Sequence, residues 1–222
     1  MIGSFREDGG GQFYPGLYPA IVTDIVDTEK LGRIEVKFPW LGEKGEEDVR
    51  AWATLLTPYA DKDQGIEILP AVDSQVVVGF EAGNLRRPYI VGACWNGKEA
   101  LPEPPQSANN KRLMKTRSGS LLEFDDTDGS AKVTLSMKSG HKLVVDDGAQ
   151  EVKLTHANGC LIKFDASGNV TLTATSGVTV NAPSGLTVTA PSATFSGSVT
   201  CMAFTATSVT SPVYSQGAGN FW

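Results

Sequence analysis

The chain is poor in the residues from which metal centres and nucleophilic catalytic sites are usually built. Its 222 residues include 2 His and 3 Cys. The cysteines, Cys94, Cys160 and Cys201, are far apart, and this fits neither a disulfide framework nor a zinc site. No apolar run reaches the roughly 18 residues that a membrane-spanning helix needs. The first residues lack a basic flank leading into an apolar stretch, so we expect no secretory signal.

Charge of either sign is missing from one whole section of the chain. The formal net charge is −6, yet every Asp, Glu, Lys and Arg lies at or before Asp165. Residues 166–222 consist mainly of Ser, Thr, Ala, Val and Gly. A globular domain normally carries charge throughout, so the chain joins parts of different kinds. The acidic balance, with scattered Lys and Arg, also argues against nucleic-acid binding.

Residues 12–100 have the pattern of a compact all-β domain. Runs rich in Val, Ile and aromatic residues, separated by turn residues, predict five strands. These runs are residues 18–26, 32–38, 50–56, 75–80 and 88–93. Five short strands without a convincing helix predict an OB-fold barrel. We expect residues 1–11, which are rich in Gly, to form a flexible arm, and the Pro-rich residues 101–112 to form an extended linker.

Residues 113–175 repeat with a period of about 20 residues. Equivalent places are occupied by Gly119, Gly140 and Gly159, and further along by Leu122, Leu143 and Ile162. Each unit has the pattern of a strand, a turn and a second strand. A fixed period indicates an architecture in which each unit buries a face on its neighbour. We therefore predict a neck built of β-repeats.

Residues 176–222 repeat with a period of eight, as in VTVNAPSG followed by LTVTAPSA. Apolar and hydroxyl residues alternate, which predicts short half-buried strands. Such strands need partners, most simply from symmetric copies of the same chain. The apolar residues expected at the core of that assembly are Val178, Val180, Leu186, Val188, Phe195 and Val199. A disordered or glycosylated tail is the alternative, although disordered tails usually carry charge and few β-branched apolar residues.

Two stretches of the first domain, Tyr18–Leu41 and Trp52–Pro102, resemble the OB domain of contractile-tail baseplate spikes. This family includes phage baseplate assembly protein V and the VgrG spikes of type VI secretion. The residues that carry the resemblance are Leu31, Gly32, Arg33, Phe38, Pro39, Trp40, Leu69, Pro70, Val76–Phe80, Arg87, Pro88, Asn96 and Gly97. The ending Ser211–Asn220 also looks like the tail of protein V relatives.

The resemblance implies an all-β homotrimer, in which an N-terminal OB-fold barrel is followed by a C-terminal intertwined triple-stranded β-helix. It implies a membrane-puncturing central spike, assembled in the cytoplasm and carried by a phage virion or contractile injection particle. The implied partners are a trimeric baseplate hub, the target envelope transiently, and a PAAR-type protein at the tip, Phe221 and Trp222. The residues implied to mark the hub-docking domain are Leu31, Gly32, Arg33, Phe38, Pro39, Trp40, Arg87 and Pro88.

The sequence departs from some relatives of this family. It has no lysozyme domain between the barrel and the repeats, and no His-x-His pair near its end, because its histidines are His141 and His156. We therefore predict no metal ion at the tip. Which kind of contractile particle carries the chain, and whether a protein caps the tip, stay open.

Candidate catalytic groups are weak throughout the sequence. The acidic cluster of Glu43, Glu46, Glu47 and Asp48 lies among glycines and indicates a solvated loop rather than a glycosidase. No Gly-x-Ser-x-Gly motif occurs, and we expect Cys94 to be a small buried hydrophobic residue. We expect no catalytic residue, cofactor or metal. Two alternatives to the spike remain: a spike-associated peptidoglycan hydrolase, and a monomeric OB module that binds nucleic acid or sugar and has a disordered tail.

Overall fold

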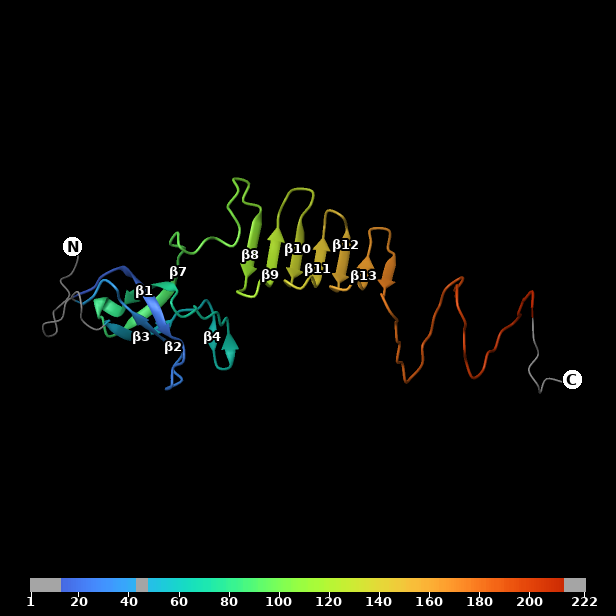
Figure 1. The fold of residues 1–222 in the computed structure, drawn as a ribbon, viewed down its shortest axis with the longest axis horizontal. Coiled ribbons are helices and arrows are strands. Elements are labelled where there is room, and N and C mark those ends of the chain that lie inside the picture. The colour runs from blue at the N-terminus through green and yellow to red at the C-terminus, as the bar shows by residue number, and fades with distance from the viewer. Residues whose placement is uncertain (1–12, 43–47, 214–222) are drawn as a thin grey trace.

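The computed structural model describes residues 13–42 and 48–213, and the description below is confined to them. In this part the protein is all-β, as predicted, with one short 3-10 turn, η1 (Glu81–Gly83). Figure 1 shows a barrel, then a flat sheet whose strands succeed one another along the long axis, then an extended tail. None of the described residues belongs to a helix long and apolar enough to span a bilayer.

The first unit is a closed five-stranded barrel with strand order β1-β2-β3-β7-β6. Its strands are β1 (Leu17–Asp24), β2 (Arg33–Lys37), β3 (Arg50–Leu55), β6 (Gln75–Phe80) and β7 (Pro88–Ala93). The predicted barrel is thereby confirmed, with strand ends that differ from the expected ones by two residues or fewer. Strands β3 and β7 close it through a short parallel pairing, Thr54 with Tyr89 and Leu55 with Ile90.

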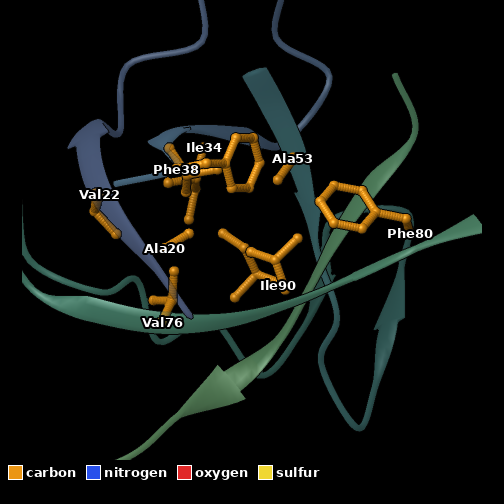
Figure 2. Close-up of a cluster of buried hydrophobic side chains, with 10 residues drawn as sticks. Ala20, Val22, Ile34, Phe38, Ala53, Val76, Phe80 and Ile90 are labelled. Atoms are coloured by element: carbon orange, nitrogen blue, oxygen red, sulfur yellow. The ribbon is translucent and has the colours of Figure 1, made fainter. Parts of the chain in front are cut away.

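Alternation along the barrel strands places every second side chain in the core. In β6, Val76, Val78 and Phe80 are buried, whereas the residues between them are partly exposed. This period of two is what a strand with one buried face requires. The core side chains, most of them shown in Figure 2, are Ala20, Val22, Ile34, Val36, Phe38, Ala53, Val76, Val78, Phe80 and Ile90. Between β3 and β6 the chain forms a small hairpin of β4 (Ala60–Asp61) and β5 (Gln64–Gly65).

The second unit is a seven-stranded antiparallel meander in which each strand pairs with the next. Its strands are β8 (Lys111–Lys115), β9 (Leu121–Asp125), β10 (Lys132–Ser136), β11 (Lys142–Asp146), β12 (Glu151–Thr155), β13 (Leu161–Phe164) and β14 (Val170–Thr173). Strand β8 therefore includes the last two residues of the segment predicted as linker.

The repeated glycines of the sequence form the hairpin turns along one edge of this sheet. Gly119, Gly140 and Gly159 all have φ between 88° and 100°. In each turn the glycine N–H donates to the carbonyl oxygen three residues earlier, for example Gly140 to Met137 at 3.0 Å. A three-residue hairpin loop needs a residue of positive φ in its last position, and glycine takes it without strain. The 20-residue period thus arises from one turn chemistry used repeatedly.

The tail from Ala174 to Val213 contains no strand. Figure 1 shows it continuing away from β14 as extended legs that run back and forth across the long axis. One hydrogen-bonded turn lies in the octad region, where Gly185 N–H donates to Ala182 O at 3.0 Å. Strands that pair with other chains form no ladder within one chain, so the β-helix stays a prediction. The expected arm 1–11, the carboxylates of Glu43, Glu46 and Glu47, and the tip residues Phe221 and Trp222 lie outside the described residues.

Candidate assembly surfaces

Several family-like residues of the barrel hold the barrel itself together. Phe38 is 1% exposed and belongs to the core. Trp40 stacks on Tyr18 with ring centroids 4.6 Å apart, and its Nε1–H donates to the Pro19 carbonyl oxygen at 2.7 Å. A partly buried indole that satisfies its N–H in this way gives both apolar contact and a fixed orientation. Phe38 and Trp40 therefore have a role in packing the barrel that needs no partner protein.

Arg33 fixes the loop between β1 and β2. Its guanidinium donates to both carboxylate oxygens of Asp27, at 3.0 and 2.9 Å, and to Glu29 at 2.8 Å. Asp27 also accepts the backbone N–H groups of Glu29 and Leu31. The Arg33 guanidinium, with these N–H groups, holds the pKa of the Asp27 carboxyl well below its usual range. The loop that carries the motif residues at 31–33 is thus rigidly held.

The remaining motif residues divide between the interior and the surface. Pro88 is buried at the start of β7. Leu31 is 62% exposed, and Gly32 and Pro39 are exposed as well. The Arg87 side chain is 64% exposed and pairs with Glu81 at 3.1 Å. Among the eight residues predicted to mark hub docking, only Leu31, Gly32, Pro39 and Arg87 are exposed enough to contact a second protein.

The meander sheet has one apolar face that nothing in residues 13–42 and 48–213 covers. Strand register places its apolar side chains in two rows that cross all seven strands. The first row is Phe124, Val133, Val145, Val152, Phe164 and Val170, beside Arg112 of β8. The second row is Met114, Leu122, Leu135, Leu143, Leu154, Ile162 and Leu172. We call these two rows the apolar face.

The size of the apolar face is unusual for a protein surface. Leu122 is partly buried, and the other residues of both rows are between 36% and 64% exposed. Seven strands at the usual spacing extend the rows over roughly 30 Å. Monomeric soluble proteins rarely expose a continuous apolar patch of this kind unless it binds something. None of these side chains was predicted from the sequence as part of an interface, although alternation in runs such as LLEFD and KVTLS marks them.

The opposite face of the sheet is mostly polar and carries ion pairs, beside four partly buried aliphatic side chains, Leu113, Leu121, Val144 and Leu161. Lys111 lies 3.6 Å from Glu123, and Lys163 lies 2.5 Å from Glu151. Thr134, between them on β10, is buried. The sheet is therefore amphipathic, because charged and hydroxyl groups predominate on this face, whereas the two rows on the other face are apolar apart from Arg112.

The apolar tail residues predicted for a trimer core are also uncovered in the single chain. Val178 is 55% exposed, Leu186 is 69% exposed and Phe195 is 71% exposed, and Val180, Val188 and Val199 lie within that range. Within residues 174–213 they have no strand neighbour. Sheet and tail thus form one continuous stretch of chain whose apolar side chains lack cover.

Binding chemistry for small ligands is sparse in the described part of the chain. No group of three or more His, Cys, Asp or Glu side chains that could hold a metal ion occurs there. The prediction for Cys94 is wrong, because the residue follows the end of β7 and is exposed. A groove between Trp95, Pro105 and the start of β8 is lined by Glu103 and Lys111, which pair with each other at 2.8 Å.

Comparison with known proteins identifies the barrel. Residues 18–95 match the family described as the type VI secretion system/phage-baseplate injector OB domain. The type VI secretion system spike protein VgrG1a of Pseudomonas aeruginosa is 31% identical over 93 residues, 41% of this chain and 14% of that protein. VgrG3 of Vibrio cholerae is 23% identical over 130 residues, 56% of the chain and 13% of that protein. The matched region therefore spans about one seventh of the length of these curated relatives.

Proposed function

Because the chain belongs, through its barrel, to the VgrG-like family of type VI secretion and phage-baseplate spikes, we propose that it is the homotrimeric central spike of a contractile tail or injection particle. The function is structural rather than enzymatic. The barrel docks on the baseplate, the meander sheet and the tail form the shaft, and the C-terminal end leads. Sheath contraction drives this shaft through the envelope of the target cell.

The apolar face is the observation that carries the proposal. Covering a half-exposed Val, Leu, Ile or Phe side chain contributes about 1 kcal/mol, so the two rows together contribute roughly 10 kcal/mol per chain. That is comparable to the whole stability of a typical domain. A single chain with this face in water therefore lacks the stabilisation that covering the two rows would give. A second or third copy of the same sheet supplies a matching face.

Three copies fit the molecule better than a cover from an unrelated protein. Each sheet forms one side of a three-sided prism, with its apolar face inward and the ion pairs such as Lys163–Glu151 outward. The neutral tail follows the same axis, where three chains pair their backbone groups and leave no long free edge. The core of this part comprises Val178, Val180, Leu186, Val188, Phe195 and Val199.

The partners follow from the two ends of this shaft. The exposed motif residues Leu31, Gly32, Pro39 and Arg87 contact a trimeric baseplate hub. A PAAR-type protein sits on the other end, at Phe221 and Trp222. The spike is assembled in the cytoplasm and becomes part of a virion or injection particle, and it contacts the target envelope only during contraction.

Electron microscopy of particles from the producing cell tests this function. An antibody against the barrel should label the baseplate end of contractile particles, and particles made without this chain should lack the central spike. Labelling elsewhere contradicts the proposal. Clearing of cell walls in a zymogram by the purified chain would instead support the hydrolase alternative.

A further inference from the structure

A third row of side chains on the same side of the sheet as the apolar face contains metal-binding groups. It runs along the hairpin turns, where Met137 N–H donates to His141 O at 2.9 Å and His156 N–H donates to Cys160 O at 2.8 Å. Alternation puts these four side chains on the side of Leu135, Leu143, Leu154 and Ile162, because each lies two residues beyond one of them. Thioether, two imidazoles and thiol therefore follow one another across four neighbouring strands.

The two imidazoles of this row lie against each other. The ring centroids of His141 and His156 are 4.3 Å apart and the ring planes are inclined by 57°. The rings come from neighbouring hairpin turns, so two rigid backbone segments hold them at this separation. His141 is partly buried and His156 is exposed. Neither ring takes part in an ion pair within the described residues.

Hydrogen bonds fix the orientation of the His156 ring, as is usual for histidines that bind a metal ion. Its Nδ1 lies 2.6 Å from Asn158 Oδ1 and 3.3 Å from the Asn158 backbone N–H. In the tautomer that makes the shorter bond, Nδ1–H donates to Asn158 Oδ1 and the lone pair is left on Nε2. Metal-ligating histidines typically make this kind of bond with their second nitrogen. Asn158 Oδ1 is held in turn by the Cys160 N–H at 3.1 Å. His141 Nδ1 accepts only the longer 3.3 Å bond from Ala157 N–H, and a change of tautomer frees its Nε2.

We propose that His141 and His156 form a two-imidazole site for a late first-row divalent metal ion. Imidazole pairs suit Cu²⁺, Ni²⁺ and Zn²⁺, with Cu²⁺ bound most tightly, whereas Mg²⁺ and Ca²⁺ require oxygen ligands. Water completes the coordination shell, because no third ligand joins the pair among the described residues.

A bound ion would tie two adjacent turns of the sheet to each other. Besides the contact between the two rings, the one hydrogen bond between loops 137–141 and 156–160 among the described residues is the long Ala157–His141 bond. The site lies within each chain, so it does not depend on the proposed trimer. It is also far along the sequence from the tip, where no metal ion is predicted.

Calorimetric titration of the full-length chain with Ni²⁺ tests the site, because Ni²⁺ does not oxidise the Cys160 thiol. The titration is run on protein as purified and on protein refolded in the presence of Ni²⁺, so that assembly cannot hide the site. We expect one ion per chain, and at least a tenfold loss of affinity in His141→Gln and in His156→Gln. Lys142→Gln, next to His141 on the other face, should bind as the wild type does.

Copper spectroscopy identifies the ligands directly. In the Cys160→Ser variant, which removes the thiol nearest the site in the sequence, the electron paramagnetic resonance spectrum of bound Cu²⁺ should show two equivalent nitrogen ligands. The far-ultraviolet circular dichroism of every variant should match the wild type, which separates loss of the site from loss of the fold. No saturable binding in either preparation overturns the proposal. Binding that survives loss of both imidazoles, or that disappears only with Cys160, overturns it too.

Discussion

Leu154→Asp places a carboxylate in the middle of the apolar face, and its neighbour Thr155→Asp provides a matched control. Both residues lie in β12, both substitutions add one negative charge, and both introduce a residue that strands disfavour. Leu154 is 49% exposed on the apolar face, whereas Thr155 points to the polar face, opposite Lys142. The two variants therefore add the same charge to the same strand, but on opposite faces of the sheet.

The two substitutions should differ widely in their effect on the free energy of assembly. Each Leu154→Asp chain loses about 1 kcal/mol of apolar contact and must also bury a carboxylate, at a cost of several kcal/mol. Over three chains the sum is on the order of 10 kcal/mol, or about seven powers of ten in the dissociation constant. Thr155→Asp adds a charge next to Lys142 in water. Apart from the cost of placing Asp in a strand, such a surface substitution changes the free energy of unfolding by no more than about 0.5 kcal/mol.

Sedimentation equilibrium over a dilution series measures this difference. The wild type and Thr155→Asp should remain assembled throughout the series, while Leu154→Asp should dissociate to single chains or fail to assemble. Unfolding of the barrel, followed by tryptophan fluorescence in a urea titration, should be the same in all three proteins, because Trp40 and Trp52 lie in the barrel unit. Equal masses for the two variants would refute the assignment of the apolar face to a chain-to-chain contact.

Three further predictions concern the barrel. Ile90→Ala should lower the free energy of unfolding by about 3 kcal/mol in a urea titration, because a side chain only 1% exposed leaves a cavity; no loss of stability would contradict the core assignment. Gly83→Ala should lower the free energy of unfolding by about 1–2 kcal/mol in the same titration, since φ of Gly83 is 75° and an added Cβ would meet the Phe13 ring. An unchanged urea midpoint would argue against this turn. The depressed pKa of Asp27 stabilises the barrel above the ordinary pKa of 3.8, and this contribution is lost as the pH falls below that value. Asp27→Asn should therefore lower the thermal midpoint near neutral pH, with a difference from the wild type that shrinks on acidification; a constant difference would contradict the ion pair.

The barrel could be predicted because local signals and long-range packing agree there. Alternation in Gln75–Phe80 marks which residues enter the core, and the turn residues around Asp27 separate the strands. The repeated glycines marked the 20-residue period in the sequence, whereas their place in three-residue hairpin loops, which demand positive φ at one position, is seen in the structure. The exposed position of Cys94 was not predictable in this way, because it depends on where β7 ends.

The assembly surfaces were harder to predict for a physical reason. Alternation along each strand shows that Leu143 and Leu154 lie on the apolar face of their own strands. Only the register of β11 with β12 shows that the two side chains are neighbours. The tail shows the opposite case. Its apolar period is plain in the sequence around Val178 and Leu186, yet one chain contains no partner for it, so no strand forms within residues 174–213. Backbone pairing between chains cannot be seen in a single copy.

The mass of the purified full-length chain in solution tests the trimeric spike most directly. Light scattering should give three times 23.5 kDa, about 70 kDa, at every concentration measured. The tail beyond Asp165 should resist proteolysis in that species. A mass of 23.5 kDa with a tail that proteases remove would contradict the central claim.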